Sequence, residues 1–259
     1  MARWNRYQYQ HAITSETGPI RQVNEDSVGI CAAGKGFVLA DGVGGADKGD
    51  VASQFVVDAM ISAYQGIITS DHQEIDKIIA QHLQAIHQQL STMATSQQLR
   101  MATTIVSGYL CGTTLHYLHV GDSRLYLFRN GALALLTKDD SLRQQMLDRY
   151  PTRQQEIKTT VNRNIITQAI GVDDIDIHQA SISIKAKDVI LCSSDGAHEY
   201  LSLEQMEKHL RSKKSLQKKS QALVTQAIAQ GSNDNTSILL VKIPSTALSA
   251  VVSYLTQLV

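Results

Sequence analysis

Two kinds of hydrophobic pattern occur in separate blocks along the chain. Short runs rich in Val, Ile, Leu, Thr and Tyr, bounded by Gly, Asp or Asn, are typical of β-strands. Such runs occupy residues 26–32, 36–41, 103–111, 113–122, 123–131, 132–137, 188–195 and 236–243. Between residues 104 and 137 the links are as short as Cys-Gly and Arg-Asn-Gly. Short links imply that successive strands are antiparallel neighbours.

Apolar residues at helical spacing mark a second set of segments, which we expect to be α-helices. These segments are 51–64, 75–93, 202–210 and 216–228. Ser202 is followed three residues later by Gln205, a capping-box pattern that predicts a helix start. Because strands and helices come in blocks rather than in alternation, the pattern favours an α+β fold. In such a fold, antiparallel sheets are covered by amphipathic helices.

Two further segments have patterns of their own. Residues 138–164 are polar with Pro151 in the middle, and we expect a small helical or irregular flap inserted in the domain. The tail, about 245–259, places its apolar residues on one helical face but is too short to span a bilayer. We expect this tail to dock on the body of the protein, with a partner-binding helix as the alternative.

Length, composition and charge limit the class of protein. A chain of 259 residues with 43% hydrophobic and 19% charged residues suits one large globular domain or two small ones. We predict a single domain, 1–259. The 24 basic and 24 acidic residues cancel, which argues against nucleic acid or a membrane surface as a partner. The N-terminus does not resemble a signal peptide, and the three cysteines are far apart, so we expect a cytoplasmic protein.

Acidic residues stand at the ends of several predicted strands. They are Asp26, Asp41, Asp122, Asp195 and Asp234. If these carboxylates gathered in one buried cluster, they would repel each other and raise their own pKa values unless a cation held them together. A set of oxygen ligands without His or Cys suits a hard ion such as Mg²⁺ or Mn²⁺.

The glycines after Asp41 do not form a known nucleotide-binding loop. Counted from Gly42, a dinucleotide fingerprint fails at Asp47, where a third glycine is needed. A P-loop fails because Asp50 and Val51 stand where Lys and Ser or Thr are needed. We therefore interpret Asp41 as a metal ligand and Gly42 as the residue whose backbone carbonyl approaches the same ion.

Six short motifs in one order resemble those of a known family. They are Arg21-x-x-Asn24-Glu25-Asp26, Asp41-Gly42-Val43-Gly44-Gly45, Thr103-Thr104, Gly121-Asp122-Ser123-Arg124, Ser194-Asp195-Gly196 and Asp234-Asn235-x-Ser237. Each motif alone is weak, but their joint order is similar to that of the metal-dependent serine/threonine protein phosphatases, the type 2C family, in its compact bacterial form. The resemblance covers residues 18–243.

The resemblance implies a fold and a principal metal centre. It implies a sandwich of two packed antiparallel sheets flanked by helices, with a small flap. By correspondence of motifs, Asp41 would bridge two Mg²⁺ or Mn²⁺ ions, and the Gly42 carbonyl would bind the second. Asp195 and Asp234 would complete the first.

The same correspondence assigns the remaining candidate residues. Asp122 together with Asp195 would hold a third, weaker ion. Asp26 or Glu25 would act near the second ion, directly or through water. Arg21 matches the phosphate-binding arginine, whose planar fork grips two oxygens in a way that Lys does not. Asp41 and Arg21 are thus the expected catalytic pair.

The implied activity is hydrolysis of phosphoserine and phosphothreonine in proteins by a water that the metals activate. The substrates would be phosphorylated proteins, and the enzyme would oppose a serine/threonine kinase. Two alternatives remain open at this point: a catalytically weak regulatory module with the same fold, and a phosphatase of small phosphate esters.

Four positions depart from the family pattern. Val43 stands where some members carry a histidine that is a candidate general acid, so water on the metal is expected to take that role. Asp140 replaces a common histidine, Asn162 stands where a flap histidine is frequent, and Ala102 replaces a glycine. These changes bear on substrate choice more than on the metal acids.

Overall fold

A computed structural model describes residues 9–43, 48–172 and 174–245. Two features of the sequence lie largely outside these residues. The glycines at 44 and 45 are not described, and of the predicted tail helix, 245–259, only the first residue is.

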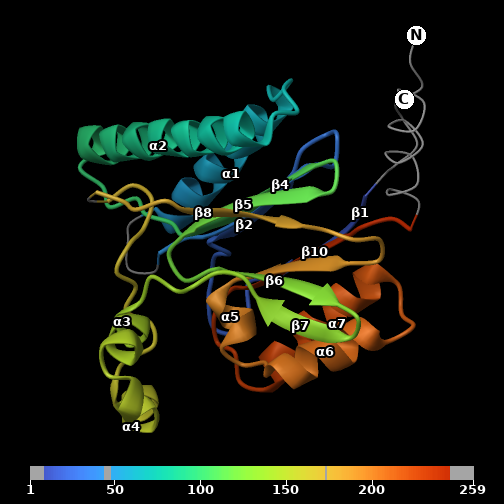
Figure 1. Ribbon diagram of the computed structural model, residues 1–259. Coiled ribbons are helices and arrows are strands. Elements are labelled where there is room, and N and C mark those ends of the chain that lie inside the picture. The colour runs from blue at the N-terminus through green and yellow to red at the C-terminus, as the bar shows by residue number, and fades with distance from the viewer. Residues whose placement is uncertain (1–8, 44–47, 173, 246–259) are drawn as a thin grey trace.

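The centre of the molecule is a pair of five-stranded antiparallel sheets (Figure 1). The first sheet has the order β1 (Gln10–Glu16), β10 (Thr236–Lys242), β9 (Val189–Ser193), β6 (Arg124–Arg129) and β7 (Ala132–Leu135). The second has the order β2 (Asp26–Ile30), β3 (Gly36–Asp41), β4 (Ile105–Cys111), β5 (Thr114–Val120) and β8 (His178–Ser183). The strand β1 thus pairs with β10, the last strand in the described residues, in the register Gln10↔Lys242 to Glu16↔Thr236.

Helices cover the outer face of each sheet and complete four layers (Figure 1). The helices α1 (Gly49–Gln65) and α2 (His72–Gln97) lie on the second sheet. The helices α5 (Asp195–His198), α6 (Leu203–Arg211) and α7 (Leu216–Ala229) lie on the first. A separate apolar cluster that includes Phe37, Leu39, Leu125 and Leu239 fills the space between the sheets.

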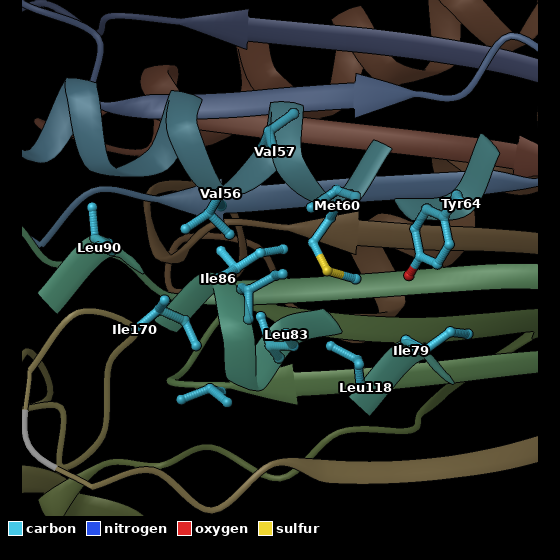
Figure 2. Packing of buried hydrophobic residues seen from close by; sticks show 14 of the residues in the cluster. Val56, Val57, Met60, Tyr64, Ile79, Leu83, Ile86, Leu90, Leu118 and Ile170 are labelled. Carbon is cyan, nitrogen blue, oxygen red and sulfur yellow. The ribbon is translucent and has the colours of Figure 1, made fainter. Parts of the chain in front are cut away.

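The outer helical layer shows why these sequences form these elements. Val56, Met60 and Tyr64 are spaced by four residues, so they lie on one face of α1 and are buried. Figure 2 shows this face meeting residues of α2, including Leu83, above the sheet that contributes Leu118. Burial of one stripe per helix therefore fixes both helices to the sheet.

The segment predicted as a flap contains two helices that stand away from the sheets (Figure 1). They are α3 (Leu142–Arg149) and α4 (Gln154–Thr160), with the short 3-10 helix η1 (Pro151–Arg153) between them. None of the residues of α3 is buried, and Ile157 is the buried residue of α4. The helices are thus held by their ends rather than by a wide apolar face.

Most predicted elements are confirmed, including the α+β class and the two antiparallel sheets. The capping box at Ser202 is present with both of its hydrogen bonds. Two strands were missed, β1 and β8, which are the edge strands at one side of each sheet. In the part of the chain that the structure describes, no helix has both the length and the apolar character needed to cross a membrane.

Candidate active site

The strand register brings the acidic residues to one end of the sandwich. Asp26 is the first residue of β2 and Asp41 the last residue of β3, and the two are directly opposite each other in the antiparallel pair. In the other sheet, Asp195 follows β9 and Asp234 precedes β10, which are neighbouring antiparallel strands. Asp122 follows β5 in the turn that leads into β6.

Most of the predicted site residues line one cavity of about 200 Å³. Those from the prediction are Arg21, Asp41, Gly42, Asp122, Asp195 and Asp234. Four more lining residues were not predicted as site residues: Val43, Thr104, Asn164 and Ile166. Asn164 and Ile166 lie at the end of the flap segment, so the flap forms part of the cavity wall. Glu25 and Asp26 are not among the lining residues.

Two threonines fix the backbone of Asp41. The Thr104 backbone N–H donates to the Asp41 carbonyl at 2.8 Å, and the Thr103 hydroxyl donates to the same oxygen at 2.9 Å. The Asp41 N–H in turn donates to the Thr104 hydroxyl at 3.1 Å. The end of β3 is therefore held rigidly where the acid enters the cavity.

Gly42 is required by close packing. A Cβ atom at this position would lie 2.5 Å from the carbonyl oxygen of Gly49, at the start of α1, and 2.8 Å from that of Glu25. No side chain fits in that space. The Gly42 N–H donates to the Glu25 carbonyl at 3.0 Å, which ties the end of β3 to the segment that precedes β2.

Asp26 and Glu25 lie behind the cavity wall. The Asp26 carboxylate is buried, and its Oδ2 accepts from the Ser194 hydroxyl at 2.8 Å. Its Oδ1 is buried and has no hydrogen-bond partner. The Glu25 carboxylate packs against Gly49, where an added Cβ would lie 2.7 Å from Oε1. A buried carboxylate oxygen without a hydrogen-bond partner is energetically costly, so Oδ1 of Asp26 is suited to bind a water or a cation.

Burial and mutual repulsion raise the pKa values of these carboxyl groups. The pKa of Asp122 is raised to about 8, first by burial and then by the charge of Asp195. Burial, as the largest cause, raises the pKa of Asp26 to about 7 and that of Asp195 to about 6. The pKa of Asp41 is raised well above its ordinary value by burial and then by the charge of Asp26. Such a group of acids is electrostatically incomplete without a cation.

Among the described residues that line this cavity, Arg21 is the one cation. Arg21 donates to Oδ2 of Asp234 at 2.8 Å, and both side chains keep part of their surface exposed. The ion pair raises the pKa of Arg21 through this hydrogen bond. Arg21 thus stands at the mouth of the cavity with its fork directed at the acids.

The donor set fits a hard divalent ion. All the acidic side chains of the cavity offer oxygen, which Mg²⁺ and Mn²⁺ prefer, and Asp26 supplies an unpartnered oxygen behind them. Within residues 9–43, 48–172 and 174–245, however, no three Asp, Glu, His or Cys side chains are yet spaced closely enough to hold an ion.

Known proteins similar to this chain share one family. The family described as "Protein phosphatase 2C" matches residues 21–230. "Serine/threonine phosphatase stp" of Listeria welshimeri is 30% identical over 237 residues, which cover 88% of this chain and 93% of that protein. "Serine/threonine protein phosphatase PstP" of Mycobacterium tuberculosis is 28% identical over 236 residues, 89% of this chain and 44% of that protein.

Solved structures give the same assignment. The S. agalactiae serine/threonine phosphatase has a TM-score of 0.85 and 28% identity, covering 91% of this chain and 99% of that chain. The catalytic domain of PstP in complex with two manganese ions has a TM-score of 0.79 and 27% identity, covering 91% of this chain and 98% of that chain. The chain therefore belongs to the protein phosphatase 2C family, and it is a serine/threonine protein phosphatase.

Proposed function

We propose that the cavity at the end of the sandwich hydrolyses phosphoserine and phosphothreonine side chains of proteins in the presence of Mg²⁺ or Mn²⁺. One observation carries this proposal: Asp41, Asp122, Asp195 and Asp234, drawn from both sheets, line one cavity together with Arg21. A structural ion pair needs one acid for each cation, so it does not explain four acids around one arginine. A site for divalent ions and a phosphate group does need several carboxylates together with a cation.

The acids have distinct proposed roles. Asp41, at the end of β3, would bridge two ions, with the Gly42 carbonyl on the second and with Asp195 and Asp234 on the first. Asp122 and Asp195 would share a third ion. Divalent ions, when bound, offset the charge of the phosphate and lower the pKa of an attacking water.

Other residues of the chain would orient the substrate and support the ligands. Arg21 would exchange Asp234 for two oxygens of the phosphate group, which its planar fork matches. Asp26 and Glu25 would act from behind the wall, through water or directly on the second ion. Val43 lines the cavity without a titratable group, so we propose that water supplies the proton for the leaving hydroxyl.

The substrate class and the cellular setting are part of the proposal. Turnover of phosphothreonine peptides, opposite to a serine/threonine kinase in the cytoplasm, follows from the likeness to the named bacterial phosphatases. The residues 1–259 would act as a single domain with a flap at about 138–164. Asn164 and Ile166, at the end of the flap, would contact the substrate beside the phosphate group.

A Mn²⁺ titration of phosphothreonine-peptide turnover tests this function, run beside Asp195→Asn. Mn²⁺ should activate the wild type, and a chelator should abolish its activity. The turnover rate of Asp195→Asn should be lower by about 100-fold or more, because the variant lacks a carboxylate that would bind the ion directly. Asp148→Asn, which removes an exposed flap carboxylate paired with Lys138, is the matched control and should keep full activity. Full turnover in chelator would contradict the proposal, and preference for small esters would correct its substrate class.

A further inference from the structure

Asp140 is a buried carboxylate that holds both backbone groups of one residue, Gly121. The side chain of Asp140 accepts the Gly121 N–H on Oδ2 at 2.9 Å, and the Asp140 N–H donates to the Gly121 carbonyl at 3.0 Å. Asp140 is 8% exposed. Gly121 directly precedes Asp122, the cavity carboxylate. The turn that contains Asp122 is therefore hydrogen-bonded to Asp140, a residue that does not line the cavity.

The gripped turn has little freedom to move. Gly121 has φ of +98°, which favours glycine, and a Cβ there would lie 2.7 Å from Cγ2 of Thr104. Thr104 lines the cavity and holds the backbone of Asp41. A shift of Gly121 would therefore change the separation between Asp122 and Asp41.

The other oxygen of Asp140 is held by a histidine. The Nε2 of His178, on β8, lies 2.9 Å from Oδ1 of Asp140. His178 stacks on His119, its cross-strand partner on β5, with ring centroids 4.9 Å apart. His119 is 4% exposed, and its buried Nδ1 has no hydrogen-bond partner in the part of the chain that the structure describes. We call His119, Asp140 and His178 the Gly121 clamp.

The clamp also touches the wall formed by the flap. The Asp140 carbonyl accepts the Thr167 N–H at 2.7 Å, and Ser141 forms a bridge with Ile166. Ile166 lines the cavity. One residue thus connects the Asp122 turn, an edge strand and the returning end of the flap.

We propose that Asp140 is a positioning residue that sets the place of Asp122 for ion binding by holding Gly121. The inference rests on the proposed role of Asp122 as a metal ligand. Partners that orient metal ligands typically change metal affinity or activity by about 10–100-fold when they are removed. Asp140 acts in this way through the backbone of Gly121. Its carboxylate accepts the Gly121 N–H, and its own N–H donates to the Gly121 carbonyl, which belongs to the peptide group that leads into Asp122.

The test compares Asp140→Ala with a matched variant at the far end of the sheets. Asp188 is also a buried carboxylate, 2% exposed, that accepts a backbone N–H, from Lys185, and pairs with a cation, Arg129. It lies before β9, at the end opposite to Asp195. Asp188→Ala should therefore cost stability without touching the Asp122 turn. Asp140→Asn keeps an oxygen for the Gly121 N–H and is the conservative variant.

Three measurements separate positioning from stability. Asp140→Ala should raise the Mn²⁺ concentration for half-activation by about 10-fold or more, with less change in KM for the phosphopeptide. Calorimetric Mn²⁺ binding should weaken in parallel, and the Gly121 amide should exchange hydrogen faster in chelator. Asp140→Asn should retain most of the wild-type Mn²⁺ response, and Asp188→Ala should retain all of it.

The outcomes are decisive in each direction. Equal shifts of the Mn²⁺ response in Asp140→Ala and Asp188→Ala would overturn the positioning role, as would an unchanged response in both. If Asp140→Ala does not fold, His178→Ala decides instead, because it removes the partner of Asp140 Oδ1. Faster exchange of the Gly121 amide and weaker Mn²⁺ binding in His178→Ala would support the positioning role, and no change in either would overturn it. If the wild type shows no Mn²⁺-dependent turnover, the proposed function is refuted. Hydrogen exchange at the Gly121 amide would then still test whether Asp140 holds Gly121.

Discussion

Arg21 reaches the cavity from the loop between β1 and β2, and it donates to Asp234 at 2.8 Å. This pair joins a cation proposed for phosphate with an acid proposed for a metal. In the proposed complex, Arg21 would bind the phosphate and Asp234 a divalent ion. Before substrate arrives, their ion pair keeps both side chains directed at the cavity. The contact thus prepares the site rather than stabilising the fold, since part-exposed pairs contribute little.

The first prediction concerns the geometry of that arginine. Arg21→Lys keeps the charge but loses the planar fork, so we expect KM for a phosphothreonine peptide to rise about 10-fold, with a smaller change in kcat. Steady-state kinetics at saturating Mn²⁺ measure both constants. Arg149→Lys, on the flap helix α3, is the control and should leave them unchanged. An unaltered KM in Arg21→Lys would remove Arg21 from phosphate binding.

The sequence could predict the acids of the cavity but not its whole wall. Asp41 and Asp195 could be found because each ends an apolar strand and belongs to a motif. Thr104 belongs to a motif but was given no role in the site. Asn164 and Ile166 gave no such chemical signal, and their place depends on how the flap returns to the sheets. The separation between carboxylates is likewise set by sheet packing, which a single sequence does not contain.

Among the elements, the flap is joined to the body by charge. Glu199 follows α5, and its carboxylate meets Arg163 at 3.4 Å, Arg124 at 3.8 Å and Arg143 at 3.9 Å. Arg143 belongs to α3 and Arg163 follows α4, whereas Arg124 begins β6. One part-buried acid therefore connects both arms of the flap to the sandwich.

We predict that Glu199→Gln loosens the flap. Three arginines would lose their shared partner, so local opening should become easier by about 1–2 kcal/mol, the order of one hydrogen-bonded charge. Limited trypsin cleavage within residues 149–163 should accelerate about 5–30-fold, as read by mass spectrometry. Glu156→Gln removes only an exposed pair with Arg153 and should change little. Equal cleavage rates in both variants would show that Glu199 does not hold the flap.

The missed strands β1 and β8 have a common cause. Both are edge strands, and His178–Ser183 is almost fully exposed, so neither needs the apolar run by which strands are recognised in sequence. The helices of the flap were only loosely predicted for a similar reason, because α3 buries no residue and shows no apolar stripe. Central strands, which are buried on both faces, were predicted correctly.

For the whole molecule, the crowded acids make stability depend on pH and on divalent ions. The pKa of Asp122 is raised to about 8 and that of Asp26 to about 7, from an ordinary value of 3.8. The folded state therefore binds more protons than the unfolded chain, and the free energy of unfolding falls as pH rises toward 8. Burial lowers the pKa of His198, which has the opposite effect but only below about pH 6.5.

The prediction is a falling melting temperature between pH 6.5 and 8.5 in the presence of a chelator. A fall of several degrees is expected, since 1 kcal/mol corresponds to about 2–4 °C in a protein of this size. Saturating Mn²⁺ should raise the melting temperature most at pH 8.5 and flatten the profile. Asp122→Asn should flatten it without metal. A melting temperature that climbs with pH in chelator would show that these carboxyls are not crowded.

The pairing of β1 with β10 joins residues 10–16 to residues 236–242 and has a consequence for biosynthesis. During translation, the second sheet, which ends with β8, can form first, but the sheet that carries Asp195 and Asp234 stays incomplete until Lys242 has left the ribosome. A nascent chain therefore cannot strip phosphate from its neighbours. Enzymatic competence therefore arrives in a single step, when β10 has emerged and pairs with β1.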